Sequence, residues 1–214
     1  MKKYKVQRVE NNAVKISGKS DSIIWNKAEA LTDFSSPWSS QEHAKISFKA
    51  LYDDEKFYFS FSVHDSEVHM DTSGDGIENI GNSDRVELFF RKNKDLNPYY
   101  CLEIDPSVRI MDFIAKPNKD FDFLWNWPKE DIIVKSDIQD HLFVVEGSIS
   151  LKSMKSFGLI QDNKIEAGIF RAKYNLEQNK EYHPTWITWV NPQTEEPNFH
   201  ISSSFGILEL AQLQ

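Results

Sequence analysis

Two neighbouring segments carry charged side chains whose types suit the recognition of hydroxyl groups. In SDRVELFF (83–90), apolar residues alternate with a second set that includes Arg85 and Glu87, as in a half-buried β-strand. The segment YYCLEID (99–105) follows after a polar turn, and the two predict an antiparallel hairpin that places Glu87 opposite Glu103. Carboxylates and guanidinium groups form strong directional hydrogen bonds. The spacing therefore predicts a charged sheet face that suits a polyhydroxylated ligand.

Three interpretations of this face remain open at this stage. Phe89 and Tyr99 add aromatic surface to it, and Asp105 falls opposite Arg85, so a ligand-binding face is one of them. A solvated outer face with ion pairs is the second. The third is a glycoside hydrolase, because two facing glutamates approach the separation of about 5 Å that retaining enzymes use. An ion network relieved by the arginine is favoured over the hydrolase.

Composition narrows the possible functions. The chain has 214 residues, a net charge of −8 and a pI near 5.3, which disfavours nucleic acid and anionic membranes as partners. Cys101 is the only cysteine, so an internal disulfide and a cysteine-based zinc site are excluded. No apolar run has transmembrane length, and the start lacks the apolar stretch of a signal peptide. A cytoplasmic location is expected for the chain as written, and a secreted or periplasmic one if a leader was removed.

Short alternating segments dominate the chain and predict an all-β fold. Turns separate them at regular spacing, and helical patterns are confined to 25–30 and 151–157. We therefore expect a single domain over 1–214, built as a two-sheet antiparallel β-sandwich with little helix. The strands are expected at 13–17, 43–52, 57–63, 83–90, 99–105, 109–115, 132–136, 141–151, 164–174, 185–190 and 205–210.

The polar loop 65–84 is too long for a simple hairpin connection and invites a calcium interpretation. Its DTSGDG stretch begins like an EF-hand loop, but Asn82 stands where that motif needs glutamate, and no helices flank it. A solvated acidic loop is the alternative. The calcium site expected in a sandwich would use Asp65, Asp71, Asp75 or Asp84.

Tryptophan rings in the second half of the chain are candidates for stacking on a sugar, whose C–H groups form an apolar patch. Trp125 and Trp127 lie in the loop FLWNWP, where such rings also serve to pin a loop. Trp186 and Trp189 have opposite strand parity, so one of them is expected to face the interior. Arg171 and His200 are either site residues or ion-paired and hydrogen-bonded structural residues.

Six motifs in order resemble the family 9 carbohydrate-binding modules. They run from about Val14 to Leu210 and comprise VKISGKSDSIIWNKAEALTDF, LYDDEKFYFSFSVHD, SDRVELFF, YYCLEIDP, VVEGSISL and WVNPQTEEPNFHISSSFGILEL. The resemblance implies a two-sheet sandwich that binds sugar without catalysis and carries calcium. It also implies a role in polysaccharide catabolism, with an oligo- or polysaccharide as ligand, a glycoside hydrolase on a separate chain as partner, and a monomeric state.

The resemblance also implies roles for individual residues. Glu87 falls on the hydroxyl-binding glutamate of the family and Trp189 on the later of its two clamping tryptophans. The other clamp position lies near 80–81, where this chain has no aromatic residue. Trp125 or Trp127 is then the candidate for the second ring. A haem-binding relative of the fold, with Met70 and Met111 as candidate ligands, and a purely structural domain are the remaining alternatives.

Overall fold

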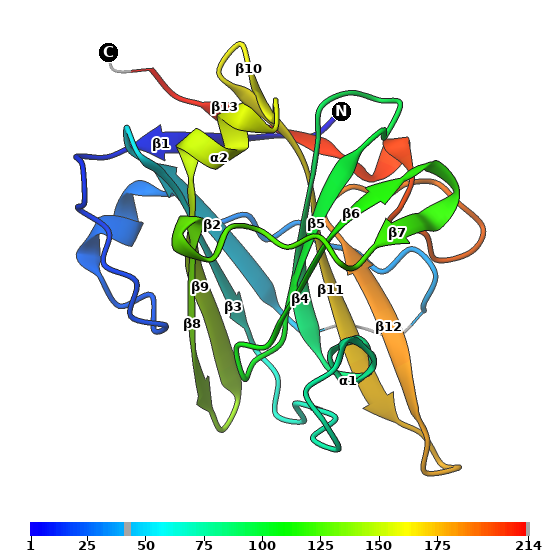
Figure 1. Ribbon diagram of the computed structural model, residues 1–214. Helices are drawn as coiled ribbons and strands as arrows, with labels where there is room; N and C mark the ends of the chain where they lie inside the picture. Colours follow the sequence, from blue (N-terminus) through cyan, green and yellow to red (C-terminus); the bar gives the residue numbers. More distant parts are fainter. Residues whose placement is uncertain (41–43, 213–214) are drawn as a thin grey trace.

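A computed structural model describes residues 1–40 and 44–212, and the fold is predominantly β (Figure 1). Two layers of strands face one another, and helix is confined to short pieces. The two α-helices are α1 (Ile77–Gly81) and α2 (Leu151–Ser156). The strands are β1 (Lys3–Arg8), β2 (Ile46–Tyr52), β3 (Lys56–Val63), β4 (Arg85–Arg91), β5 (Tyr99–Ile104), β6 (Ile110–Lys116), β7 (Asp120–Asp122), β8 (Ile132–Gln139), β9 (Leu142–Ser150), β10 (Ile160–Gln161), β11 (Lys164–Leu176), β12 (Tyr182–Thr188) and β13 (Gly206–Leu210).

The strands form one curled, mixed sheet. The first layer has the order β7-β6-β5-β4-β11-β13, with β10 and β12 also paired to β11, and the second has the order β2-β3-β9-β8. Strand β1 joins the layers because it pairs in parallel with both β13 and β2. The all-β prediction is confirmed, whereas two separate, wholly antiparallel sheets are not what the chain forms. The strand expected at 13–17 is absent, and residue 43 lies outside the described residues.

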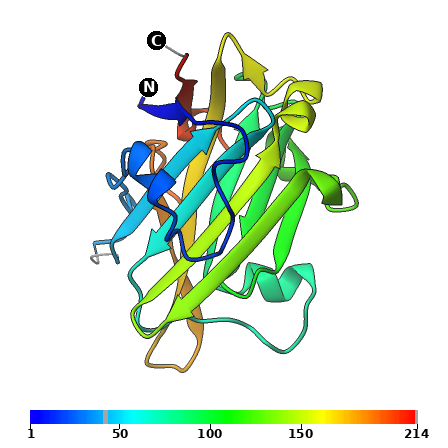
Figure 2. The same cartoon turned by 90° about the vertical axis from the view of Figure 1, so that its left-hand side faces the viewer.

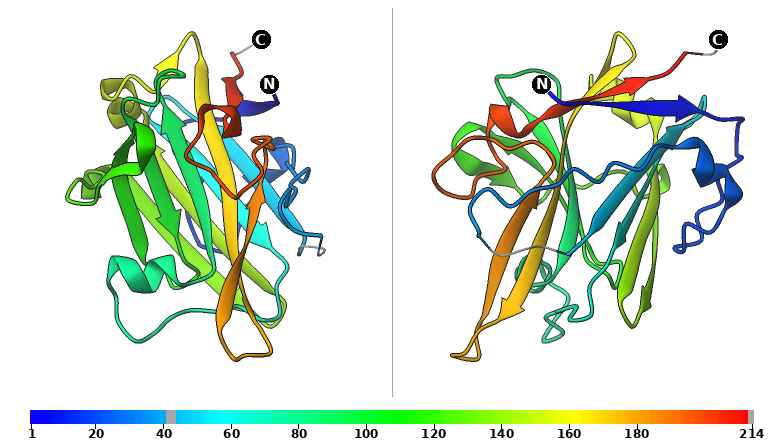
Figure 3. Two further views of the ribbon diagram at one scale, coloured as in Figure 1. Left: turned by 90° about the vertical axis from the view of Figure 1, so that its right-hand side faces the viewer. Right: turned by 180° about the vertical axis from the view of Figure 1, so that it is seen from behind.

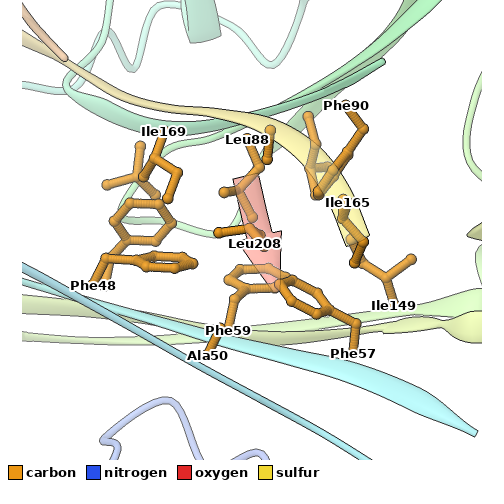
Figure 4. Close-up of a cluster of buried hydrophobic side chains, with 14 of the residues drawn as sticks. Phe48, Ala50, Phe57, Phe59, Leu88, Phe90, Ile149, Ile165, Ile169 and Leu208 are labelled. Carbon is orange, nitrogen blue, oxygen red and sulfur yellow. The ribbon is translucent and has the colours of Figure 1, made fainter. Parts of the chain in front are cut away.

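The main core fills the space between the two layers (Figure 4). Phe57, Phe59 and Phe61 of β3 point inward and are fully buried, as their alternation predicts. The rings of Phe57 and Phe59 face side chains of β4 and β11 from the opposite layer, including Leu88, Phe90 and Ile165. Burial of this apolar surface is the main force that holds the layers together.

The second layer is also covered on its outer face, which the strand pattern does not predict. Residues 9–28 cross this face (Figure 2), so Tyr58 and Ser60, which alternate with the inward-facing phenylalanines of β3, are buried as well. The indole Nε1 of Trp25 donates a hydrogen bond of 2.7 Å to the fully buried carboxylate of Glu146. The outer face of the first layer is also partly covered, because Phe89 and Phe170 of this face lie buried under Phe199 and Phe205. None of the helices in the described residues is long and apolar enough to cross a membrane.

Candidate functional site

The pairing of β4 with β5 brings the charged residues of the predicted hairpin together on the outer face of the first layer. Figure 3 (left) shows the strands of this layer from that side. Glu87 pairs with Glu103 in the register of β4 and β5, as predicted. On the other side of β4, Arg85 pairs with Ala172, and Ala172 pairs with Trp186. Side chains of directly paired residues share a face of the sheet. The register thus places a tryptophan beside the arginine and the two glutamates.

Arg85 links the two carboxylates. Its Nε donates a hydrogen bond of 2.6 Å to Oε2 of Glu103 and lies 3.0 Å from Oε1 of Glu87. Its Nη1 donates to the backbone carbonyl of Gly81 at 2.8 Å. Asp105, expected opposite Arg85, instead accepts a bond of 2.7 Å from Nε of Arg109. All three members of the cluster are buried, with Glu87 only 2% and Glu103 only 4% exposed.

Burial changes the charge of this cluster. Desolvation and the neighbouring Glu103 carboxylate raise the pKa of Glu87 to about 8, and the Arg85 guanidinium only partly opposes them. Desolvation also raises the pKa of Glu103. Glu87 therefore keeps its proton near neutral pH. Oε1 of Glu87 is buried, and its polar contact is the ion pair of 3.0 Å with Nε of Arg85.

Trp186 is a partly exposed aromatic residue on this face. Its ring is half-buried, and the Arg85 guanidinium carbon lies 5.5 Å from the ring centroid, within the range of a cation–π contact. Phe199 packs edge-on against it, at 5.5 Å and 89°. These two contacts fix the orientation of the indole and leave part of it available to a ligand.

A small cavity of about 140 Å³ opens beside Trp186. Phe199, which forms one wall, stacks on Phe170 of β11 at 4.1 Å and so anchors the loop before β13 to the sheet. His200 lies against the Tyr99 hydroxyl, 2.9 Å from Nδ1. The lining residues are Lys119, Trp186, Pro197, Asn198, Phe199 and His200.

His200 is uncharged at this position. Burial, together with the nearby positive charges of Lys119 and Arg85, lowers its pKa to about 3. A neutral imidazole presents hydrogen-bonding nitrogens without a net charge. Tyr99, which holds it, is itself fully buried, so Tyr99 supports the cavity rather than lining it. The cavity thus combines an aromatic wall, a neutral imidazole and one exposed ammonium group.

Three predicted tryptophans lie elsewhere. Trp189 is 1% exposed in the main core, where its ring approaches Gly206 so closely that a Cβ there would lie 2.5 Å away. Trp127 is buried in the same core, and its Nε1 donates to the Ser153 hydroxyl at 3.0 Å. Trp125 is half-buried against Tyr100, with ring centroids 5.3 Å apart. The structure does not bring any of them to the Glu87 face.

Arg171 also faces away from this site, into a buried ion cluster at the end of the main core. Its Nη2 donates to Asp65 and lies 3.4 Å from Oδ2 of Asp84. Lys173 approaches the same two carboxylates, at 3.2 Å from Asp65 and 3.1 Å from Asp84. Two predicted calcium ligands are thus neutralised by two cations of the chain itself.

The other two predicted calcium ligands lie apart from that cluster. The Asp71 carboxylate accepts bonds from Ser73 and Asn79, which lower its pKa to about 2. Asp75 is exposed and lies 3.7 Å from Nη1 of Arg109. Within residues 1–40 and 44–212, no three His, Cys, Asp or Glu side chains gather as a metal site. Calcium binding stays a prediction.

Of the residues that line the small cavity, sequence reasoning singled out His200 as a site residue and missed the others, Lys119 and Trp186 among them. Lys119 ends the short 3₁₀ helix Pro117–Lys119, whose sequence has no pattern that points to a ligand. Trp186 was recognised only as one of two tryptophans of opposite parity, and parity does not say which of the pair faces the core. The pairing of β12 with β11 decides this, because it aligns Trp186 with Ala172 on the Glu87 face.

Three solved structures resemble this chain in fold. A carbohydrate-binding module of family 9 from Caldicellulosiruptor kristjanssonii, in complex with glucose, matches with a TM-score of 0.65 and 18% identity over 100% of this chain and 97% of that chain. The same kind of module in complex with cellotriose matches with a TM-score of 0.64 and 18% identity, over 100% and 95%. A proposed carbohydrate-binding protein from Bacteroides uniformis matches with a TM-score of 0.75 and 16% identity, over 98% and 99%. At these identities the likeness shows the fold.

The sequence comparisons add the family. No curated protein matches the chain. The sequence model of one family, described as carbohydrate family 9 binding domain-like, matches residues 16–213. The chain therefore belongs to the carbohydrate family 9 binding domain-like proteins.

Proposed function

We propose that this chain binds a saccharide without cleaving it, with Trp186 as the stacking platform. The observation that carries the proposal is the partly exposed Trp186 ring, held over the buried Arg85–Glu87–Glu103 cluster and next to a cavity lined by His200 and Lys119. An aromatic ring covers the C–H groups of a pyranose, and the polar groups around it bind hydroxyls. Family membership and the saccharide-bound neighbours support this function.

The size of the site supports a single sugar ring in the small cavity. At about 140 Å³ it is smaller than the range of roughly 300–1,000 Å³ that is usual for larger ligands. Burial of on the order of 100 Å² of apolar surface contributes about 2.5 kcal/mol before the costs of association. With a few hydrogen bonds, the expected dissociation constant is roughly 10 μM to 1 mM.

The burial of the two glutamates favours binding over hydrolysis. A retaining glycosidase needs one carboxylate as nucleophile and the other as acid at the same sugar ring. Glu87 and Glu103 are nearly inaccessible, and Arg85 contacts both. Their role in the proposal is to fix Arg85, and through it Trp186, from below the ligand.

A glycan screen that measures both retention and cleavage tests this proposal. Wild-type protein is applied to an array that includes β-glucans, xylans, mannans and chitin, and the best-bound glycan is then incubated with the protein and assayed for reducing ends. Retention without release of reducing ends is the expected result. Release of reducing ends that Glu87→Gln abolishes would favour the hydrolase instead.

A further inference from the structure

The second layer ends in a strand whose outer edge is unpaired. Strand β8 is eight residues long and is the last strand of the sheet order, next to β9 (Figure 2, yellow-green). In the described part of the chain, its backbone hydrogen bonds join it to β9, and none joins it to another segment. An unpaired edge presents a row of N–H and C=O groups that can pair with a strand of another chain.

Other edge strands of the sheet carry features that discourage such pairing. Strand β7, at the opposite end of the sheet order, has only three residues, and two of them are Asp120 and Asp122. Strand β12, which pairs with β11, contains Pro184, whose nitrogen cannot donate to a neighbouring strand. Strand β8 is long and its sequence, IIVKSDIQ, has no proline. Its edge is therefore able to pair.

The segment 9–28 leaves this edge open, because it covers the face of the second layer. The backbone N–H of Gly18 donates a hydrogen bond of 2.6 Å to the Glu146 carboxylate of β9. Gly18 also lies close to the backbone of Ser136. The Ser136 side chain points the other way, since its Oγ donates to the Pro106 carbonyl at 2.5 Å. Gly18 thus lies against the outer face of β8.

Several side chains of β8 lack neighbours that a second strand would supply. Ile133 is 43% exposed and Ile138 is 46% exposed. Lys135 is exposed and has no ion-pair partner among the described residues. The Asp137 carboxylate accepts a hydrogen bond of 2.8 Å from the exposed Gln139 side chain. The edge therefore carries one unpaired charge of each sign, two residues apart on the same face of the strand.

Backbone geometry and charge together select one way for a second copy of β8 to pair with this edge. In an antiparallel pair of identical strands, directly opposite residues have the same parity, because both must direct their N–H and C=O groups at each other or both away. The registers centred on Lys135, Ser136 and Asp137 meet this condition. Centring on Lys135 or on Asp137 brings like charges directly opposite each other, which is unfavourable. Centring on Ser136 places Lys135 of each copy opposite Asp137 of the other.

The register centred on Ser136 also covers exposed apolar surface. It places Ile138 of each copy opposite Val134 of the other, on the side of the strand that faces the main core. It places Ile133 opposite Gln139 on the outer face. Because the same residues of both copies meet about a two-fold axis, the assembly closes as a dimer and does not propagate.

We infer that β8 is the interface of a weak, two-fold symmetric dimer of this chain, in which the two copies of β8 pair antiparallel about Ser136. Lys135 and Asp137 of one copy then form ion pairs with Asp137 and Lys135 of the other. A single strand pair forms a small interface of the kind found in transient complexes, so we expect a dissociation constant of roughly 10–100 μM. The family resemblance of the sequence implies a monomer, and the inference is independent of the proposed saccharide binding.

The test is sedimentation velocity of the full chain over a range of about 5–500 μM, which brackets the expected dissociation constant. Wild type should shift from monomer to dimer over this range. Asp137→Lys and Lys135→Asp each place like charges opposite one another, and each should weaken the dimer at least tenfold. An equimolar mixture of these two variants restores opposite charges at both positions and should associate as wild type does. Lys152→Asp is the matched control, because it makes the same charge change at an exposed residue of α2, and it should dimerise as wild type does.

Lys135→Asp also places a carboxylate opposite Glu146 of β9, so thermal unfolding checks that each variant folds. Hydrogen exchange of the wild-type chain supplies a test that needs no variant, since amides within 132–139 should become protected as the protein concentration rises. Wild type that stays monomeric at about 500 μM, single variants that dimerise as wild type does, or two folded variants that fail to associate when mixed would overturn the inference. Concentration-dependent protection confined to a segment outside 132–139 would also overturn it.

Discussion

Removal of the Trp186 side chain should weaken ligand binding at the proposed site while the chain still folds. Trp186→Ala deletes the stacking surface, and we expect a loss of about 2 kcal/mol in binding, or roughly thirtyfold in affinity. The variant also loses the contacts of Trp186 with Arg85 and Phe199. These are worth roughly 1–2 kcal/mol of unfolding free energy in total, so the chain should still fold.

Affinity electrophoresis and titration calorimetry against the best-bound glycan measure this loss, and thermal unfolding checks the fold. Trp125→Ala is the matched control, because Trp125 is also half-buried but packs on Tyr100, away from the Glu87 face. The control should keep wild-type affinity. A Trp186→Ala variant that binds as tightly as wild type, or a Trp125→Ala variant that loses binding instead, would refute the placement of the site.

Three further predictions concern the buried charges. Because the pKa of Glu87 is raised to about 8, the folded state holds a proton that the unfolded chain releases above about pH 4.5, so the contribution of Glu87 to stability is full at low pH and is lost as the pH rises to 8. The melting temperature of Glu87→Gln minus that of wild type should therefore rise between pH 5 and pH 8. A difference that stays constant with pH would contradict this reasoning. Arg171→Met leaves the Asp65 and Asp84 carboxylates short of a partner and should lower the free energy of unfolding, measured in urea titrations, by about 3–5 kcal/mol. The further substitutions Asp65→Asn and Asp84→Asn should recover much of this loss. A loss below about 1 kcal/mol would argue against a tightly coupled cluster. Calcium bound at the predicted aspartates would raise the melting temperature in millimolar CaCl₂ relative to EDTA, because a hundredfold excess of ligand over its dissociation constant adds about 2.7 kcal/mol to the free energy of unfolding. Arg171 and Lys173 already neutralise two of these carboxylates, so we expect no rise in melting temperature from calcium at that pair.

Most of the strands could be predicted because their alternation is local. The segments 57–63 and 83–90 show a period of two, and the structure has strands β3 and β4 there. Strand β1 was not predicted, because its partners β13 and β2 are distant in sequence and pair with it in parallel. Its alternation of lysines with Tyr4 and Val6 is visible in hindsight. The burial of Tyr58 could not be predicted from its own strand, because the cover comes from residues 9–28.

In the candidate site, too, contacts between adjacent strands could be predicted, whereas contacts between distant segments could not. The pairing of Glu87 with Glu103 followed from the length of the turn between two adjacent strands, and the structure confirms it. The choice between Trp186 and Trp189 depends on how β12 pairs with β11 and on where β12 ends. The partners of Arg171 come from 65 and 84, more than 80 residues away in sequence. Contacts of that range leave no periodic signal in the sequence.

The most direct test of the proposed site follows the indole N–H signals of the six tryptophans by nitrogen–proton NMR while the best-bound glycan is added. Single Trp→Phe variants assign the signals. A site on the outer face of the first layer predicts that the Trp186 signal shifts with saturation, while those of the buried Trp25, Trp127 and Trp189 stay in place. A shift of the Trp189 or Trp125 signal with no change at Trp186 would contradict this placement.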